Sequence, residues 1–196
     1  MGHGAVQLPM TAEEFLAWDA TQTIKHEFVR GEVFAMAGAH EAHVTVTMNV
    51  AMALRQHLKG SPCRTFQTDM KLRVEAADAY CYPDVMVTCS AADAADPLIK
   101  REPTLVVEVL SPSTAAYDRG EKFAAYRLLP SLQEYLLVDP VARRCDLYRL
   151  GADGLWVLHP GAPQQGVHFA SVGLELDGAR LWDEVPPVSV DTAAAR

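Results

Sequence analysis

The sequence lacks the features that mark secreted, membrane-spanning and zinc-binding chains. It has no run of about 18 apolar residues, so no membrane span is predicted. Its start, "MGHGAVQLPM", lacks the charged and apolar regions of a secretory signal. The four cysteines, at positions 63, 81, 89 and 145, form no CxxC pair, so a zinc site is not expected. We therefore predict a cytoplasmic protein with reduced thiols and no membrane partner.

Basic residues are also in short supply. The chain has 17 Lys and Arg against 25 Asp and Glu, a formal net charge of −8, which argues against nonspecific binding to nucleic acid. A local basic groove, or a site whose own metal offsets the negative charge, is compatible with this balance. The 196 residues, 49% of them hydrophobic, suit one domain. We place that domain at 1–182 and predict a disordered tail at 183–196.

Local patterns predict helices and strands in alternation. "TAEEFLAW" opens a helix with a capping box formed by Thr11 and Glu14, and "KHEFVRGEVFAMA" alternates around Arg30-Gly31 as a hairpin. Two more helices are expected at 40–59 and, capped by Asp118, at about 118–129. The apolar stripe of the helix at 40–59 is predicted to be Val44, Met48, Ala51 and Leu58. Strands are expected near 63–67, 69–75, 82–88, 104–110, 133–138, 143–149 and 154–159, with weaker signals from 167 to 182.

An acidic residue interrupts one of these apolar strands. In "PTLVVEVLSPST" (103–114), Glu108 lies among valines and leucines. An ionised carboxylate costs several kcal/mol in such a place, so it must be paired, protonated or bound to a metal. Asp84 in "YPDVMVT" enters another strand directly after Pro83. If the two strands are neighbours, the two carboxylates can face one another.

Two facing carboxylates repel unless a cation lies between them. Mg²⁺ prefers oxygen ligands, and two carboxylates plus a strand carbonyl such as that of Val109 would serve. Lys122 lies in the first turns of the helix that follows the strand of Glu108, where it can lean back toward the sheet. A metal, two acids and a lysine are the parts of a hydrolytic site for phosphate esters.

Each of these residues also has a plain structural interpretation. Glu108 could pair with Arg73, Asp84 could cap a turn after Pro83, and Lys122 could be a solvated helix residue, as most lysines are. Taken singly, these interpretations are favoured. Taken together and in this order, the residues favour a site.

The order of a "PD" pair at a strand start, then E in the next strand, then K, resembles the PD-(D/E)XK nuclease superfamily. The longer pattern is more specific. It comprises "HEFVRGEVFAMAG…H", "YPDVMV", "PTLVVEVLSPST…D…K…Y" and "EYLLVDP". Over about residues 10–150 it resembles the bacterial "putative restriction endonuclease" family, Uma-two. The resemblance implies an α/β fold with a restriction-endonuclease-like mixed β-sheet core, flanked by α-helices and carrying additional β-hairpins.

Carried across residue by residue, the resemblance implies Asp84 and Glu108 as metal ligands and as catalytic residues together with Lys122. The third position of the E-x-K tripeptide is Leu110 here, and the lysine lies instead on the following helix, as is usual in this family. Further positions match the family's pattern and are candidate additional site residues: Glu27, Glu32, His43, Asp118 and Tyr126.

Some of these matches have alternatives. Glu27 could instead form a salt bridge with Lys25 or Arg30, and His43 is better explained as a packed or hydrogen-bonding helix residue than as a ligand. Two positions depart from the family's pattern: Tyr82 precedes the "PD" pair, where a small polar residue or Gln is common, and Leu136 replaces a usual tryptophan.

The resemblance implies an endonuclease that uses Mg²⁺ or Mn²⁺ to hydrolyse DNA. The alternative is a nuclease-fold binding or scaffold module with weak or lost catalysis, which the net charge favours. A third, weaker interpretation is a hydrolase for another phosphoester or nucleotide. A homodimer is a candidate assembly, because nucleases that cut both strands often work as dimers, but the sequence spacing does not require one.

Overall fold

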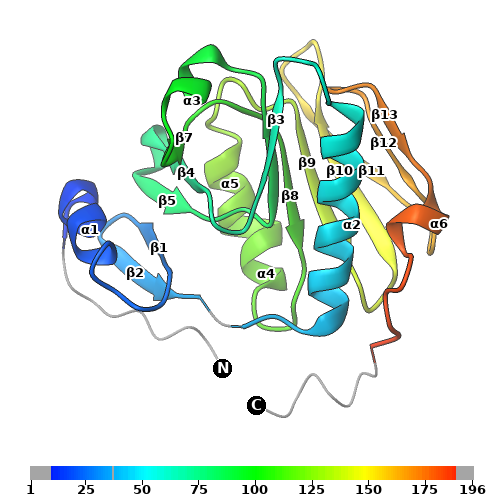
Figure 1. Cartoon of the computed structure of the whole chain (residues 1–196), viewed down its shortest axis with the longest axis horizontal. Helices are drawn as coiled ribbons and strands as arrows, with labels where there is room; N and C mark the ends of the chain where they lie inside the picture. The colour runs from blue at the N-terminus through cyan, green and yellow to red at the C-terminus, as the bar shows by residue number, and fades with distance from the viewer. Residues whose placement is uncertain (1–9, 37, 189–196) are drawn as a thin grey trace.

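A mixed six-stranded sheet forms the centre of the computed structural model, which describes residues 10–36 and 38–188. Its strand order is β11(Trp156–Pro160), β10(Arg144–Leu150), β9(Glu134–Asp139), β8(Pro103–Val109), β6(Val85–Thr88), β3(Arg64–Gln67). β8 and β9 run parallel, and the other neighbours in this sheet are antiparallel. Helices lie on both sides of the sheet, which agrees with the predicted fold class (Figure 1).

A second, five-stranded sheet lies beside the first. Its order is β2(Glu32–Ala35), β1(His26–Val29), β5(Ala79–Cys81), β4(Lys71–Val74), β7(Ile99–Lys100). The predicted hairpin is confirmed as β1 and β2, and Arg30 and Gly31 both take the positive φ that such a tight turn needs, 50° and 90°. The predicted capping box of Thr11 and Glu14 also forms and opens α1(Ala12–Asp19).

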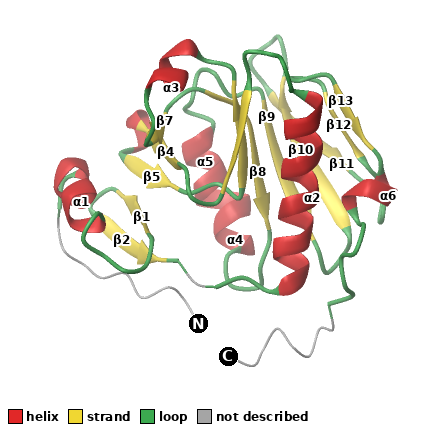
Figure 2. Cartoon of the chain, in the orientation of Figure 1, coloured by secondary structure: helices red, strands yellow, loops and turns green. Residues whose placement is uncertain are grey.

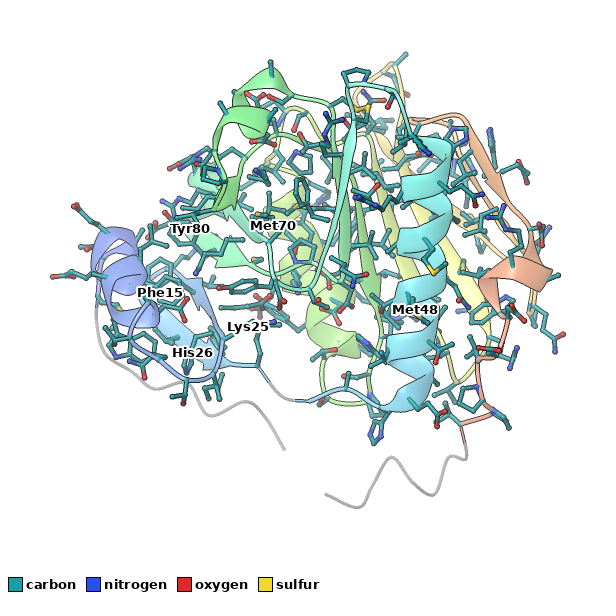
Figure 3. All side chains as sticks on the ribbon, viewed as in Figure 1. Phe15, Lys25, His26, Met48, Met70 and Tyr80 are labelled. Atoms are coloured by element: carbon teal, nitrogen blue, oxygen red, sulfur yellow. A yellow bond between two sulfur atoms is a disulfide. The ribbon has the colours of Figure 1, made fainter. Side chains whose placement is uncertain are left out.

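α1 is held on this smaller sheet by aromatic contacts. Phe15 stacks on Phe28 and Tyr80, with ring centroids 5.1 and 5.8 Å apart. Figure 3 labels Phe15 and Tyr80. These residues and Val33 form a small core separate from those of the larger sheet. Burial of large aromatic side chains supplies the hydrophobic free energy that fixes the helix.

The two faces of the larger sheet are covered by different helices (Figure 2). α2(Glu41–His57) packs on one face together with the hairpin of β12(Val167–Phe169) and β13(Leu174–Leu176). The other face is covered by three consecutive short segments: α4(Ala115–Tyr117), the π-helical turn η2(Asp118–Lys122) and α5(Phe123–Tyr126). The connections hold three more short helices, η1(Glu75–Ala77), α3(Ala91–Ala95) and α6(Gly178–Leu181).

α2 occupies the predicted range but buries a different stripe. Val44 and Met48 are 54% and 45% exposed, whereas Val46, Val50 and Leu54 are fully buried. The predicted stripe is therefore wrong for its first half. The helix carries apolar residues on two sides, and the sheet takes the side with the regular i, i+4, i+8 spacing of Val46, Val50 and Leu54.

The helix predicted from Asp118 begins earlier. Helical structure starts at Ala115, so Asp118 lies inside it and is not its cap. Asp118 instead begins the π-helical turn, which ends at Lys122. π-turns widen a helix locally and are frequent at functional sites.

The prediction of four reduced thiols is wrong for two of them. Cys63 and Cys89 form a disulfide, and Cys81 and Cys145 are free and buried. The two bonded residues flank the paired strands β3 and β6, in which Arg64 lies opposite Thr88. Opposite positions on antiparallel strands bring Cβ atoms close enough to bond, which a spacing of 26 residues in the sequence does not reveal.

The predicted disordered tail is wrong in its first residues. Val185 is 6% exposed and packs in the core beside α2, and its carbonyl accepts a hydrogen bond from Arg143 at 3.1 Å. Residues 189–196 lie outside the described part of the chain. Within the described residues, no helix combines the length and apolar character that crossing a bilayer demands.

Candidate active site

Asp84 and Glu108 project from the same face of the larger sheet. β6 and β8 are antiparallel neighbours, and Val85 pairs with Val107. Asp84 precedes Val85 and Glu108 follows Val107, so this register places Asp84 opposite Glu108. Opposite residues of an antiparallel pair share a face. The two carboxylates are also linked through the backbone, because the N–H of Val109 donates to Asp84 Oδ2 at 2.7 Å. The juxtaposition expected from the sequence is therefore present.

Glu108 is held by groups from the helical segments that cover this face. Its side chain is 4% exposed. Lys122 Nζ lies 2.9 Å from Glu108 Oε1, and the hydroxyl of Tyr126 donates to the same oxygen at 2.8 Å. Lys122 and Tyr126 are four residues apart, so the helix brings both to one side. The solvated lysine and the Glu108–Arg73 pair are both excluded, since Lys122 is buried and Arg73 pairs with Glu75 and Asp78.

Two more carboxyl groups surround Lys122. Glu27 on β1 places Oε1 3.1 Å from Lys122 Nζ, and Asp118 places Oδ1 3.8 Å from it. The N–H of Tyr82 donates to Glu27 Oε1 at 3.0 Å. The alternative of a salt bridge between Glu27 and Lys25 or Arg30 is wrong: Glu27 pairs with Lys122, and Lys25 pairs with Asp69. The cluster thus contains four carboxyl groups and one lysine, a large excess of negative charge.

The excess charge and the burial perturb the ionisation of these groups. Burial raises the pKa of Glu108 well above its usual range, and the charges of Asp84, Asp118 and Glu27 add to this, while Lys122 opposes it. Burial also raises the pKa of Asp118. Burial alone would lower the pKa of Lys122, but the carboxylates of Glu108, Glu27 and Asp118 outweigh it and raise that pKa well above the usual range. Lys122 therefore stays charged, and an added cation would be needed to keep every carboxyl ionised.

Asp84 and His43 form the more open side of the cluster. Their side chains are 15% and 17% exposed, and His43 Nε2 lies 3.3 Å from Asp84 Oδ2. Burial alone would lower the pKa of His43, but the hydrogen bond and charge of Asp84 raise it overall.

The structure gathers most of the residues singled out from the sequence. Glu27, His43, Asp84, Glu108, Asp118, Lys122 and Tyr126 are linked by the contacts above. Glu32 is exposed at the start of β2 and makes no contact with this cluster in the described part of the chain. Sequence reasoning missed two supporting groups, because their roles use main-chain atoms: the N–H of Tyr82, and the carbonyl of Asp118, which accepts from the Tyr135 hydroxyl at 2.9 Å.

Comparison with known proteins identifies the family. The model of the Uma-two family, described as "Putative restriction endonuclease", matches residues 12–179. The chain belongs to the Uma-two family. Two relatives from Synechocystis sp., the uncharacterized proteins slr1290 and sll1609, are 38% and 36% identical to it. The alignments cover 84% and 76% of this chain and 87% and 85% of those relatives.

A solved structure shares the fold. It is the crystal structure of a putative nuclease belonging to DUF820 from Anabaena variabilis, with a TM-score of 0.76 at 17% sequence identity. The match covers 91% of this chain and all of that one. The Uma-two chain therefore has a restriction-endonuclease-like fold.

The donor set of this Uma-two site fits a divalent cation. Asp84 Oδ2 is bonded to Val109 and Glu108 Oε1 to Tyr126 and Lys122, whereas the second oxygen of each carboxylate has no hydrogen-bond partner among the described residues. Within that same part of the chain, no three His, Cys, Asp or Glu side chains are already gathered as a complete metal site. Asp84 and Glu108 each keep one carboxylate oxygen for an ion, and Mg²⁺ is usually held by one or two carboxylates and several waters.

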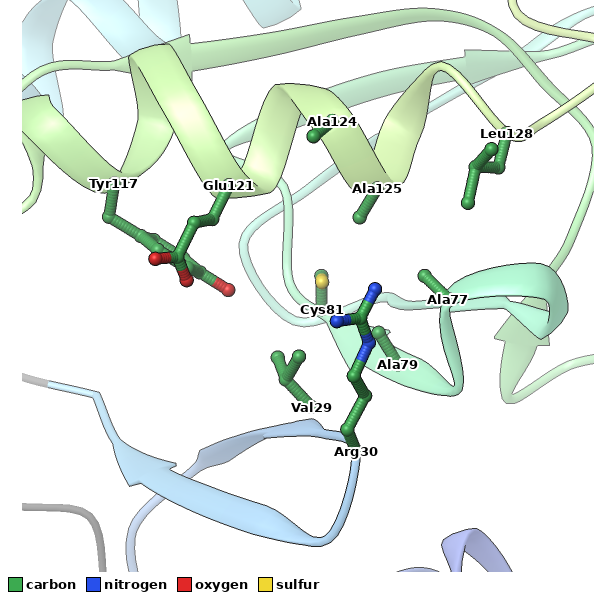
Figure 4. Close-up of a pocket in the computed structure, with 10 residues that line it drawn as sticks. All are labelled: Val29, Arg30, Ala77, Ala79, Cys81, Tyr117, Glu121, Ala124, Ala125 and Leu128. Atoms are coloured by element: carbon green, nitrogen blue, oxygen red, sulfur yellow. The ribbon is translucent and has the colours of Figure 1, made fainter.

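A pocket of about 410 Å³ lies beside the cluster (Figure 4). Small residues line it from two sides, Ala125 on α5 and Ala79 and Cys81 on β5 (Figure 4). Arg30 and Glu121 also line it. Tyr117, which precedes Asp118, lines it on the side of the helix. None of the four clustered carboxyl groups lines this pocket.

Proposed function

We propose that this protein is a metal-dependent endonuclease that hydrolyses phosphodiester bonds of DNA. The observation that carries the proposal is the convergence of Asp84, Glu108 and Lys122 on one buried face of the sheet, in a chain of the "Putative restriction endonuclease" family. A buried cluster with perturbed ionisation and a shortage of positive charge is typical of a functional site.

In this proposal, Asp84, Glu108 and a main-chain carbonyl such as that of Val109 hold Mg²⁺ or Mn²⁺. The ion would lower the pKa of a bound water and offset charge on the scissile phosphate. Lys122 stays protonated and donates hydrogen bonds toward the developing negative charge. Tyr126 and Glu27 are positioning residues: Tyr126 fixes the Glu108 carboxylate, and Glu27 fixes the ammonium group of Lys122.

The test is a plasmid-nicking assay with purified wild type, Asp84→Ala and Glu108→Ala in Mg²⁺ or Mn²⁺. We expect each substitution to lower the rate at least about 100-fold, because several kcal/mol of charge stabilisation is lost. Glu175→Ala, which removes an exposed carboxylate of β13, is the matched control and should nick like wild type. Equal nicking by all four proteins would mean that a contaminant causes the activity, and it would sink the proposal.

A second candidate is a binding or scaffold module without useful catalysis, and one observation favours it. Seven lysine and arginine side chains of the described residues, apart from Lys122, already form ion pairs with carboxylates: Lys25, Lys71, Arg73, Arg101, Arg119, Arg144 and Arg149. Arg119, the basic residue nearest the site in sequence, pairs with Asp146 at 2.9 Å. Calorimetry with Mn²⁺ separates the candidates, because a module that has lost its metal site should show no binding.

A further inference from the structure

α2 carries a stripe of exposed apolar side chains on the side turned away from the sheet. Val44, Met48 and Met52 are 54%, 45% and 63% exposed, whereas Val46 and Val50 are fully buried. Their spacing of four residues places the three exposed side chains on one side of the helix, and Figure 3 labels Met48, the middle one. Single exposed apolar residues are ordinary, but a contiguous apolar patch of this kind marks an interaction surface.

Oppositely charged side chains lie at the two ends of this stripe. Glu41 is in the first turn of α2 and Arg55 in its last turn, and both are exposed. Positions seven residues apart stay on one seam of a helix, so Glu41, Met48 and Arg55 share the exposed side. The ion pairs formed among the described residues include neither Glu41 nor Arg55. Both charges are therefore available to a partner.

The stripe is complementary to its own reversed copy. Glu41 and Arg55 are each seven residues from Met48, and Val44 and Met52 are each four residues from it. A two-fold axis at Met48, perpendicular to α2, therefore places Glu41 opposite the partner's Arg55 and Val44 opposite the partner's Met52. Such an isologous contact uses the same patch on both copies and forms each pair twice. A helix of another protein would need this same reversed order of charges, which a second copy of this chain already has.

We propose that this protein forms a homodimer through the exposed stripe of α2, with the two helices packed antiparallel about an axis at Met48. The proposal does not depend on the proposed function. Helices that cross at about 20° keep residues seven apart in contact along their length. One helix face is small beside the ~800 Å² that each partner of a stable interface buries, so we expect a weak dimer with a dissociation constant of about 10–100 µM. Association should stop at two copies, because the pair uses up the patch.

The first experiment is sedimentation velocity of wild type, Met48→Glu and Val157→Glu from about 5 to 500 µM, since association depends on concentration. Wild type should shift from the 21.4 kDa monomer toward twice that mass. Met48→Glu brings two carboxylates together on the axis, so it should stay monomeric. Val157→Glu is the matched control, because Val157 on β11 is 48% exposed, close to the 45% of Met48. It should dimerise like wild type, and circular dichroism checks that both variants are folded.

The second experiment tests the antiparallel order through charge. Glu41→Arg and Arg55→Glu each place like charges opposite one another twice in the dimer, so each variant alone should dimerise about 10-fold more weakly than wild type. In an equimolar mixture of the two variants, each mixed pair sets two basic side chains against two acidic ones, and dimerisation should recover. A parallel pair of helices already opposes like charges in wild type, so neither substitution would weaken it.

The outcomes decide the proposal. Wild type that stays monomeric at every concentration would leave the stripe to a lipid surface or another protein, and the homodimer would be wrong. A dimer lost in Val157→Glu and kept in Met48→Glu would place the contact on β11 and overturn the proposal, as would single charge variants that dimerise as strongly as wild type. Loss of the dimer in Met48→Glu together with recovery in the mixture supports the antiparallel α2 contact, whether or not the protein cuts DNA.

Discussion

β6 and β8 present different chemistry on their two faces. Toward α2 they contribute Val85, Val87, Leu105, Val107 and Val109, which belong to one uninterrupted apolar core. Toward the helical segments on the other side, the alternate positions include Met86 and Val106, but also Asp84 and Glu108. Successive side chains of a strand point to opposite faces. The seven residues of β8 therefore supply apolar side chains to the core on one face and Glu108 to the cluster on the other.

This division separates the sources of stability from those of the proposed chemistry. The α2 face needs only volume and hydrophobicity, so its residues should matter for folding and little for ion binding. The opposite face holds buried charges whose free energies depend on one another, so a change to one member should alter the others. This division would fail if substituting an apolar residue of the α2 face changed ion binding as strongly as substituting a charged residue of the opposite face.

The largest stability effect should come from Lys122→Met. The substitution leaves Glu108, Glu27 and Asp118 buried without their cation, and breaking such a pair costs about 3–5 kcal/mol. Lys25→Met is the matched control, since Lys25 is 45% exposed and its pair with Asp69 should contribute about 0–1 kcal/mol. Urea denaturation measures both. An equal loss of stability in the two variants would show that the buried ion pairs of Lys122 contribute no more than an exposed salt bridge.

On the apolar face, Leu105→Ala should cost about 2–5 kcal/mol, because Leu105 is fully buried beside Val107 and the substitution leaves a cavity. Ion affinity measured by calorimetry on the folded variant should equal that of wild type. A large loss of Mn²⁺ affinity would show that the apolar face positions the carboxylates, and the separation of the faces would fail.

Some of this division could be predicted from the sequence. Glu108 stood out because an acid inside an apolar strand needs a partner, and Asp84 because it enters a strand directly after a proline. Both signals are local, and the structure places the two residues on neighbouring strands. Lys122 followed from its place in the helix after the strand of Glu108 and also from the family pattern, whereas Glu27 followed from the family pattern alone. The contact between them required the tertiary fold.

Other features depended on packing that the sequence leaves open. α2 has apolar residues on two sides, and only the position of the sheet decides that Val50 is buried and Met48 exposed. The π-helical turn that contains Lys122 lies inside a continuous run of helical residues, and no side-chain cap marks its start. The Cys63–Cys89 bond follows from strand register, which spacing alone does not fix.

Glu108→Gln should reveal the ionisation of the charged face through pH. The folded-state pKa of Glu108 is raised above 4.5, so its carboxyl lowers stability as pH rises from 4.5 toward the folded value. Without metal, the variant should match wild type below pH 4.5. Above that pH it should become the more stable protein, by up to about 1.4 kcal/mol per pH unit. Urea denaturation of both proteins in the presence of a chelator across pH 4–8 tests this. If the stability of wild type instead rises above that of the variant as pH rises, the ion pair of Glu108 with Lys122 outweighs the cost of burying the carboxylate.

The smallest expected effect distinguishes two tyrosines on the same face. Tyr126→Phe removes the hydroxyl that donates to Glu108, and Tyr135→Phe removes the one that donates to the carbonyl of Asp118. Each loses one buried hydrogen bond, so each should be destabilised by about 1–3 kcal/mol. Only Tyr126→Phe frees a proposed metal ligand, so it alone should weaken Mn²⁺ binding. Equal weakening by both substitutions would mean that the whole face, rather than the Glu108 carboxylate, responds to the loss of a hydrogen bond.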